Sequence, residues 1–152
     1  MRAWRQEEGF AAGAEALAFG VLVFVLGTLV VVNAWAVVDA KFAASAAARE
    51  AVRAAVEAPT AADQPGRADI AARAALAAHG GQEAAAVTPL RLGLERCQEI
   101  AYEIRVEVPA LLLPGIATRT APFVVIGRHV EVVDPYRSGL DVAPGEVPDC
   151  AF

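Results

Sequence analysis

A long apolar stretch near the start of the chain dominates the pattern of hydrophobic and polar positions. Residues 16–38, ALAFGVLVFVLGTLVVVNAWAVV, contain no ionisable side chain. A helix over these residues is about 35 Å long, slightly more than the roughly 30 Å hydrocarbon layer of a bilayer. The rest of the chain is too small to surround such a helix, and the stretch is too long for a cleaved secretory signal. We therefore predict a single transmembrane helix over residues 16–38.

The helical pattern continues beyond the apolar stretch. Residues 39–58, DAKFAASAAAREAVRAAVEA, are rich in alanine, and Pro59 then breaks the helix. Polar residues recur every four positions from Lys41 to Glu57, beside a row of small and apolar residues. We expect these residues to extend the helix as a spine, with one side exposed to solvent and the other packed against the rest of the domain. Two helices with a hinge at the membrane surface are the alternative.

Farther along the chain every second residue is apolar, and this alternation is typical of half-buried strands. The alternating residues are Leu90, Leu92 and Leu94, then Ile100, Tyr102, Ile104, Val106 and Val108, and finally Val124, Ile126, Val130 and Val132. Gly127 is a candidate bulge within the third strand. Residues 109–122 contain three prolines and leave no room for a crossover helix, so we predict an antiparallel meander.

Residues 67–79, RADIAARAALAAH, predict a short helix from Arg67 to His79. Two glycines follow it and mark its end. This helix and the spine are the available cover for the apolar face of the sheet. The predicted fold class is α+β and membrane-anchored, with a long N-terminal helix, a short second helix and a small antiparallel sheet of about three strands. The predicted segments are a polar leader or cytoplasmic stub (1–15), the span (16–38), the helix continuation (39–58) and an extracytoplasmic domain (59–152).

Composition and charge narrow the set of partners. The chain is 57% hydrophobic, and its formal net charge is -5 with a pI near 5.0. This acidity provides no general attraction to phosphate backbones, so nucleic acid is not an expected partner. The lipid bilayer is expected as a partner, because the hydrophobic excess is concentrated in the apolar stretch.

Cys97 and Cys150 are the only cysteines, and both follow the predicted span at a distance. An even pair in a small domain is typical of an oxidising compartment, so we predict a disulfide between them, with two free thiols as the alternative. The positive residues on either side of the span do not decide its orientation. The cysteines instead favour a single-pass protein of the cell membrane, with a cytoplasmic N-terminus and the C-terminal domain outside.

The sequence contains no recognisable catalytic motif. His79 and His129 are the only histidines, and neither belongs to a nucleophile elbow or an acid–base pair. His79 is expected to end a helix, where the dipole favours it. The cysteines and histidines lack the paired spacing of a zinc site, and no glycine-rich loop is suited to a nucleotide. We predict no enzymatic activity, no metal and no cofactor.

The N-terminal segment MRAWRQEEGFAAGAEALAF combines a polar leader, small residues and one early carboxylate before the apolar stretch. This order resembles the TadE-like family of tight-adherence pilus assembly, which is related to the type IV pilins. The resemblance implies that a prepilin peptidase cuts between Gly9 and Phe10, or after Gly13, and that Glu15 assists subunit docking. It extends through the Ala-rich segment 43–58 and the strand-rich end, as a pattern of composition and order.

Gly13, Gly20 and Gly27 recur at intervals of seven residues, which places them on one slowly drifting stripe of the helix. Such a stripe permits close contact with another helix or with a second copy, although membrane helices also tolerate glycine without any partner. With Glu15, Gly20 and Gly27 are the candidate docking residues.

The resemblance implies a membrane subunit that assembles or anchors a tight-adherence (Flp-type) pilus or a related secretion filament. Its partners would then be the other membrane subunits of that system. The alternative is a single-pass membrane protein whose outer interaction domain is unrelated to pili.

Overall fold

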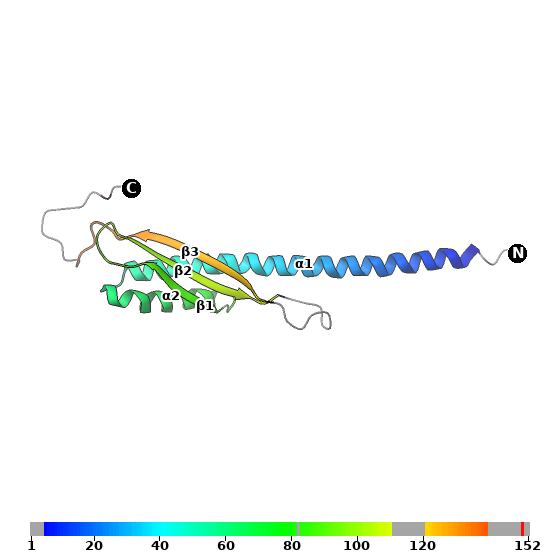
Figure 1. Cartoon of the computed structure of the whole chain (residues 1–152), viewed down its shortest axis with the longest axis horizontal. Helices are drawn as coiled ribbons and strands as arrows, with labels where there is room; N and C mark the ends of the chain where they lie inside the picture. The colour runs from blue at the N-terminus through cyan, green and yellow to red at the C-terminus, as the bar shows by residue number, and fades with distance from the viewer. Residues whose placement is uncertain (1–4, 82, 111–120, 140–149, 151–152) are drawn as a thin grey trace.

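The molecule is a long helix whose C-terminal half is packed into a small α+β domain (Figure 1). A computed structural model describes residues 5–81, 83–110, 121–139 and 150. The elements are α1 (Arg5–Val56), the 3-10 helix η1 (Ala61–Asp63), α2 (Gln64–Ala78), β1 (Ala84–Arg91), β2 (Glu99–Val108) and β3 (Phe123–Val132). The sheet order is β1-β2-β3 with both pairs antiparallel, as the sequence predicts. Helices α1 and α2 cover one face of this sheet.

Helix α1 runs for 52 residues without interruption, which confirms one continuous helix and excludes a hinge after the apolar stretch. Its packed half is built on alanine, whose high helix propensity favours the backbone and whose small side chain allows close approach. The buried positions on this side are Ala40, Ala43, Ala44, Ala47, Ala48, Ala51, Val52 and Ala55. They form one core with Leu76 of α2 and with Ile100, Tyr102, Ile104 and Val106 of β2.

The inward face of β3 differs from the predicted one. Val124 and Val130 are 55% and 50% exposed, whereas Val125 and Val133 are buried against the helices. Both faces of this strand carry valines, so period-two alternation could not show which face is covered. The register with β2 decides it, because Val125 lies opposite the buried Val106.

Gly127 is not at a bulge, contrary to the sequence-based expectation, since the β2–β3 register is continuous from Glu99 to Val108. A Cβ built on Gly127 would lie only 2.2 Å from the carbonyl oxygen of Ala44. Glycine therefore lets the backbone of α1 rest directly on β3.

Two other boundaries also differ from the prediction. Strand β1 begins at Ala84 and ends at Arg91, so Leu92 and Leu94 lie beyond it. Pairing with β2 outweighs the low strand preference of its alanines. Helix α2 begins at Gln64 rather than Arg67, with a proline in its first turn, where the missing N–H costs nothing.

Candidate functional site

The N-terminal half of α1 forms the largest exposed apolar surface among the described residues. Large side chains between Leu17 and Val38 are exposed along its length, with Trp35 74% exposed. This is the one described helix that is long and apolar enough to cross a membrane, and none of its most apolar part is buried inside the molecule. Soluble monomers rarely expose so large an apolar surface without a partner for it.

Two polar side chains within this surface donate hydrogen bonds to the helix itself. Thr28 Oγ1 donates a hydrogen bond to the carbonyl oxygen of Phe24, and Asn33 Nδ2 donates one to that of Leu29, both at 2.8 Å. Each bond joins residues four apart, so it forms inside the helix without water. A helix in hydrocarbon must satisfy its polar groups in this way, because lipid tails offer no hydrogen-bonding partner.

The candidate docking residues lie on different sides of α1. A Cβ built on Gly13, Gly20 or Gly27 meets nothing within 4 Å, so the glycine stripe is open in the single chain. Glu15 is also exposed, but the helical rotation of about 100° per residue turns it roughly 160° away from Gly13. The carboxylate and the stripe therefore lie on different faces of the helix. The sequence pattern predicted the glycine stripe, but the side of the helix on which Glu15 lies was not considered there.

Of the candidate processing residues, Gly9 and Phe10 lie in the first turns of α1, and Gly13 follows in the same helix.

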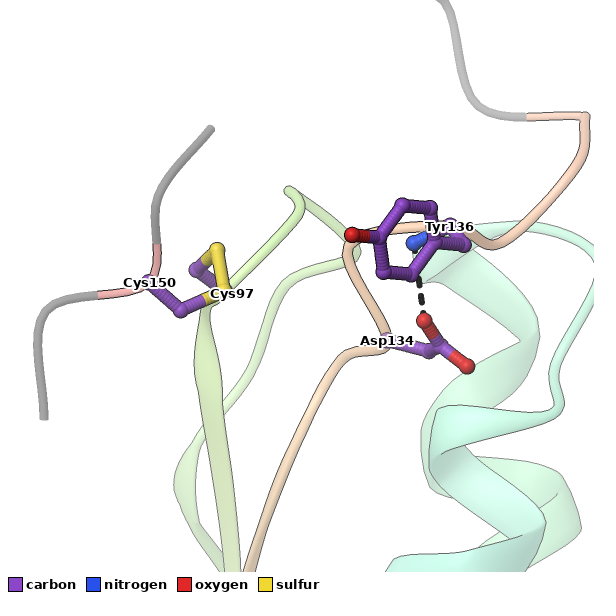
Figure 2. Close-up of a disulfide and its surroundings, with 4 residues drawn as sticks. All are labelled: Cys97, Asp134, Tyr136 and Cys150. Carbon is purple, nitrogen blue, oxygen red and sulfur yellow. Dashed lines mark hydrogen bonds between the residues drawn. A yellow bond between two sulfur atoms is a disulfide. The ribbon is translucent and has the colours of Figure 1, made fainter. Parts of the chain in front are cut away.

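A disulfide joins Cys97 to Cys150, with a Cα–Cα distance of 5.4 Å and a sequence separation of 53 (Figure 2). Cys97 lies just before β2, where its N–H donates to the carbonyl oxygen of Val133 at 3.0 Å. Beyond Val133, the backbone N–H of Tyr136 donates to the Asp134 carboxylate at 2.7 Å, which forms a turn. The disulfide thus ties Cys150 to the end of the sheet that lies farthest from the apolar half of α1.

An ion-pair cluster on the outer face of the sheet was not predicted. Glu103 is only 3% exposed, and its carboxylate accepts hydrogen bonds from Arg105 at 2.7 Å and from Arg128 at 2.6 Å. These two guanidinium groups, Arg105 first, lower the pKa of Glu103 below its usual value. Arg128 lies directly across from Glu103 in the register, so only the strand pairing brings the cluster together.

The two histidines lie on different elements, His79 at the end of α2 and His129 in β3. His79 ends α2, as predicted, and its ring Nδ1 is 2.9 Å from the carbonyl oxygen of Ala75. His129 lies opposite Tyr102 on the covered face of the sheet and is half-buried. Within the described ranges, no group of three or more His, Cys, Asp or Glu side chains is arranged to hold a metal ion.

The fold and its exposed helix define the class: an α+β protein with one N-terminal helix capable of crossing a membrane. Comparisons with family models, curated proteins and solved structures found no match to this chain.

Proposed function

We propose that this chain is a single-pass membrane subunit of the TadE-like, pilin-related kind, which helps to assemble or anchor a tight-adherence pilus or a related secretion filament. Helix α1 spans the membrane from a cytoplasmic N-terminus, and the α+β domain lies outside. The role is structural rather than enzymatic. Contacts between α1 and other membrane subunits, or a second copy, hold the subunit in place.

The main support for this proposal is that the two halves of α1 differ in environment. The alanine-lined half is buried in the domain, while the apolar half has no cover within the molecule. A bilayer supplies that cover at low cost, since the polar Thr28 and Asn33 are already hydrogen-bonded. The disulfide agrees with a domain in an oxidising compartment.

The open glycine stripe supports docking through α1. Without side chains at Gly20 and Gly27, another helix can approach closely enough for backbone contact. Glu15 lies on another side of the helix, at the edge of the apolar stretch, where an acidic group is costly unless it finds a partner. The pilus assignment itself rests on the resemblance of the N-terminal segment.

Site-directed crosslinking in native membranes tests the docking surface. Cysteine is introduced at Gly20 or Gly27, and at Val21 as the control, because the helical rotation turns the exposed Val21 by about 100° or more away from both the glycine stripe and Glu15. We expect crosslinked adducts from Gly20→Cys and Gly27→Cys but not from Val21→Cys. Equal crosslinking at all three positions would contradict a docking stripe.

Cell fractionation, intact mass and electron microscopy test the remaining parts. The chain should require detergent for extraction, and a mass that lacks the residues up to Gly9 or Gly13 would support pilin-like processing. Deletion of the gene should remove surface filaments, and the Glu15→Leu variant should fail to restore them. Recovery of the full chain as a detergent-free soluble monomer would overturn the membrane assignment, while unaffected filaments would overturn the pilus role alone.

A further inference from the structure

The last residue of β2, Val108, and the first two of β3, Phe123 and Val124, lie beside the apolar half of α1; these three residues are called the hairpin end below. Figure 1 shows β3 starting at the end of the domain nearest the N-terminus and running along α1 toward its C-terminal end. The contacts agree with this direction. Gly127 rests on Ala44, and beyond the far end of β3 Arg137 donates hydrogen bonds to the carbonyl oxygens of Val56 and Ala58.

The position along α1 beside which the hairpin end lies follows from the rise per residue of a β-strand and of an α-helix. Phe123 precedes Gly127 by four strand residues, about 13 Å, which corresponds to roughly nine residues of α-helix. Counted back from Ala44, this level is close to Trp35, just inside the apolar stretch. Ala36 and Val37 pack against the core that includes Val108, the cross-strand partner of Phe123, which supports the same level.

The hairpin end is apolar and exposed at this level. Phe123 is 48% exposed and Val124 is 55% exposed, on opposite faces of the strand. Trp35 of α1 is 74% exposed at the same level. Exposed aromatic residues gathered at one level, such as Phe123 and Trp35, are typical of the boundary between lipid tails and headgroups.

Charged groups lie next to the hairpin end, on the side away from the N-terminus. Glu107 lies across from Val124 and is exposed, so deep entry of the hairpin into hydrocarbon would bury its carboxylate. Lys41 donates a hydrogen bond to the carbonyl oxygen of Ile126, and with Arg128 it lines an open surface pocket at that edge of β3. If Trp35 lies at the boundary of the lipid tails, cations at this height would lie near the phosphates of the lipid headgroups.

We infer that the β2–β3 hairpin end is a second membrane contact, in which Phe123 and Val124 enter the headgroup–acyl boundary of the bilayer. This inference rests on the proposed span of α1. The occupant is lipid, because the exposed Phe123 and Val124 lie at the same level as the exposed apolar half of α1, which the proposed span places in the bilayer. Two contacts hold the domain in one orientation against the membrane, where a single helix would leave it free to tilt.

Depth-dependent quenching of a fluorescent probe tests the contact in the full chain. An environment-sensitive dye is attached to Phe123→Cys in vesicles of phosphatidylcholine and phosphatidylglycerol, under non-reducing conditions that leave the native disulfide intact. Nitroxide-labelled lipid with the quencher near the top of the acyl chain should roughly halve the emission at position 123. The same probe at Val130→Cys, on the same strand but about 23 Å farther along, should be unaffected.

A third probe separates this inference from the proposed function. Val30→Cys lies well inside the apolar stretch and should be quenched by lipid labelled near the end of the acyl chain. Quenching at position 30 without quenching at position 123 would refute the hairpin contact and leave the span intact. Absence of quenching at position 30 would refute the span.

Two further measurements exclude misfolding and self-association. Val124→Cys provides an independent probe on the other face of the strand, so that one misfolded variant does not decide the result. Emission that rises with the protein-to-lipid ratio, but is not quenched by lipid, would show that a second copy covers the hairpin end. That result would overturn a lipid contact.

Discussion

At the scale of single residues, two positions on β3 and β2 decide how the domain packs. Gly127 allows α1 to contact the strand through backbone atoms, and Glu103 holds two arginines together across the outer face of the sheet. Neither residue belongs to the long apolar pattern. Both depend on what lies opposite them once the strands have paired.

Substitution Gly127→Ala should destabilise the domain by about 1–3 kcal/mol, because the added methyl group would overlap the backbone of Ala44 and force α1 away from the sheet. The control is Gly66→Ala in α2, where an added Cβ meets nothing within 4 Å. The control should be neutral or stabilise by up to about 1 kcal/mol through its higher helix propensity. Thermal unfolding of the detergent-solubilised chain, followed by circular dichroism, measures both, and equal effects would contradict the proposed close approach.

Glu103 should make the stability of the domain depend on pH. Its pKa is lowered in the folded state, so its stabilising contribution is complete above the unfolded value of about 4.3 and is lost as the pH falls through the lower folded value. The melting temperature of the Glu103→Gln variant should therefore fall less than that of the wild type as the pH is lowered from about 5. Glu107→Gln, an exposed change on the same strand, should retain the wild-type slope; a common slope for all three chains would argue against the ion-pair cluster.

At the scale of elements, one buried side chain joins three segments. Gln64 Nε2 donates to the carbonyl oxygens of Ala55 at 3.2 Å and of Gly93 at 2.7 Å, and Gln64 Oε1 accepts from the Gly93 N–H at 3.1 Å. Gln64 thereby links the end of α1, the start of α2 and the segment after β1. It is fully buried, so water cannot replace these bonds.

Substitution Gln64→Ala should cost about 1–3 kcal/mol or more, since it leaves buried backbone groups without partners. Arg73→Ala in the same helix removes only an exposed ion pair with Asp69 and should change stability little. Chemical denaturation of the two variants in detergent, with hydrogen exchange at β1 as a local measure, distinguishes them. Similar stability and exchange would mean that Gln64 does not join the three segments.

At the scale of the whole molecule, α1 passes from the apolar half into the core without a linker. The domain is therefore held to the proposed span by a rigid connection. At the other end, the disulfide fastens Cys150 to Cys97, just before β2, across a separation of 53 residues. The molecule is thus constrained at both ends of its domain.

Loss of the disulfide through Cys97→Ser should lower the domain stability by about 2–4 kcal/mol, because the unfolded chain regains the entropy of a long open loop. For a domain of this size the melting temperature should fall by about 10–20 °C in the absence of reductant. Cys150→Ser and the double variant should show the same fall, and reductant should have no further effect on them. Unchanged melting would mean that the two thiols are unpaired in solution.

Local patterns in the sequence were sufficient to predict the long helix, the order of the strands and the pairing of the cysteines. The apolar stretch and the alanine-rich segment each act over neighbouring residues, so their period and composition predict α1 and most of β2 directly. The candidate docking stripe also follows from a simple repeat along one helix. These features need no knowledge of distant residues.

Only the tertiary structure decided the inward face of β3, the role of Gly127, the burial of Glu103 and the links made by Gln64. Each depends on which residues meet across strands or between helices, and a strand with valines on both faces carries no local signal for that choice. The level of Phe123 beside the apolar stretch belongs to the same group. It is established only when the sheet is packed against α1, because the two segments are far apart in the sequence and meet only through tertiary contacts.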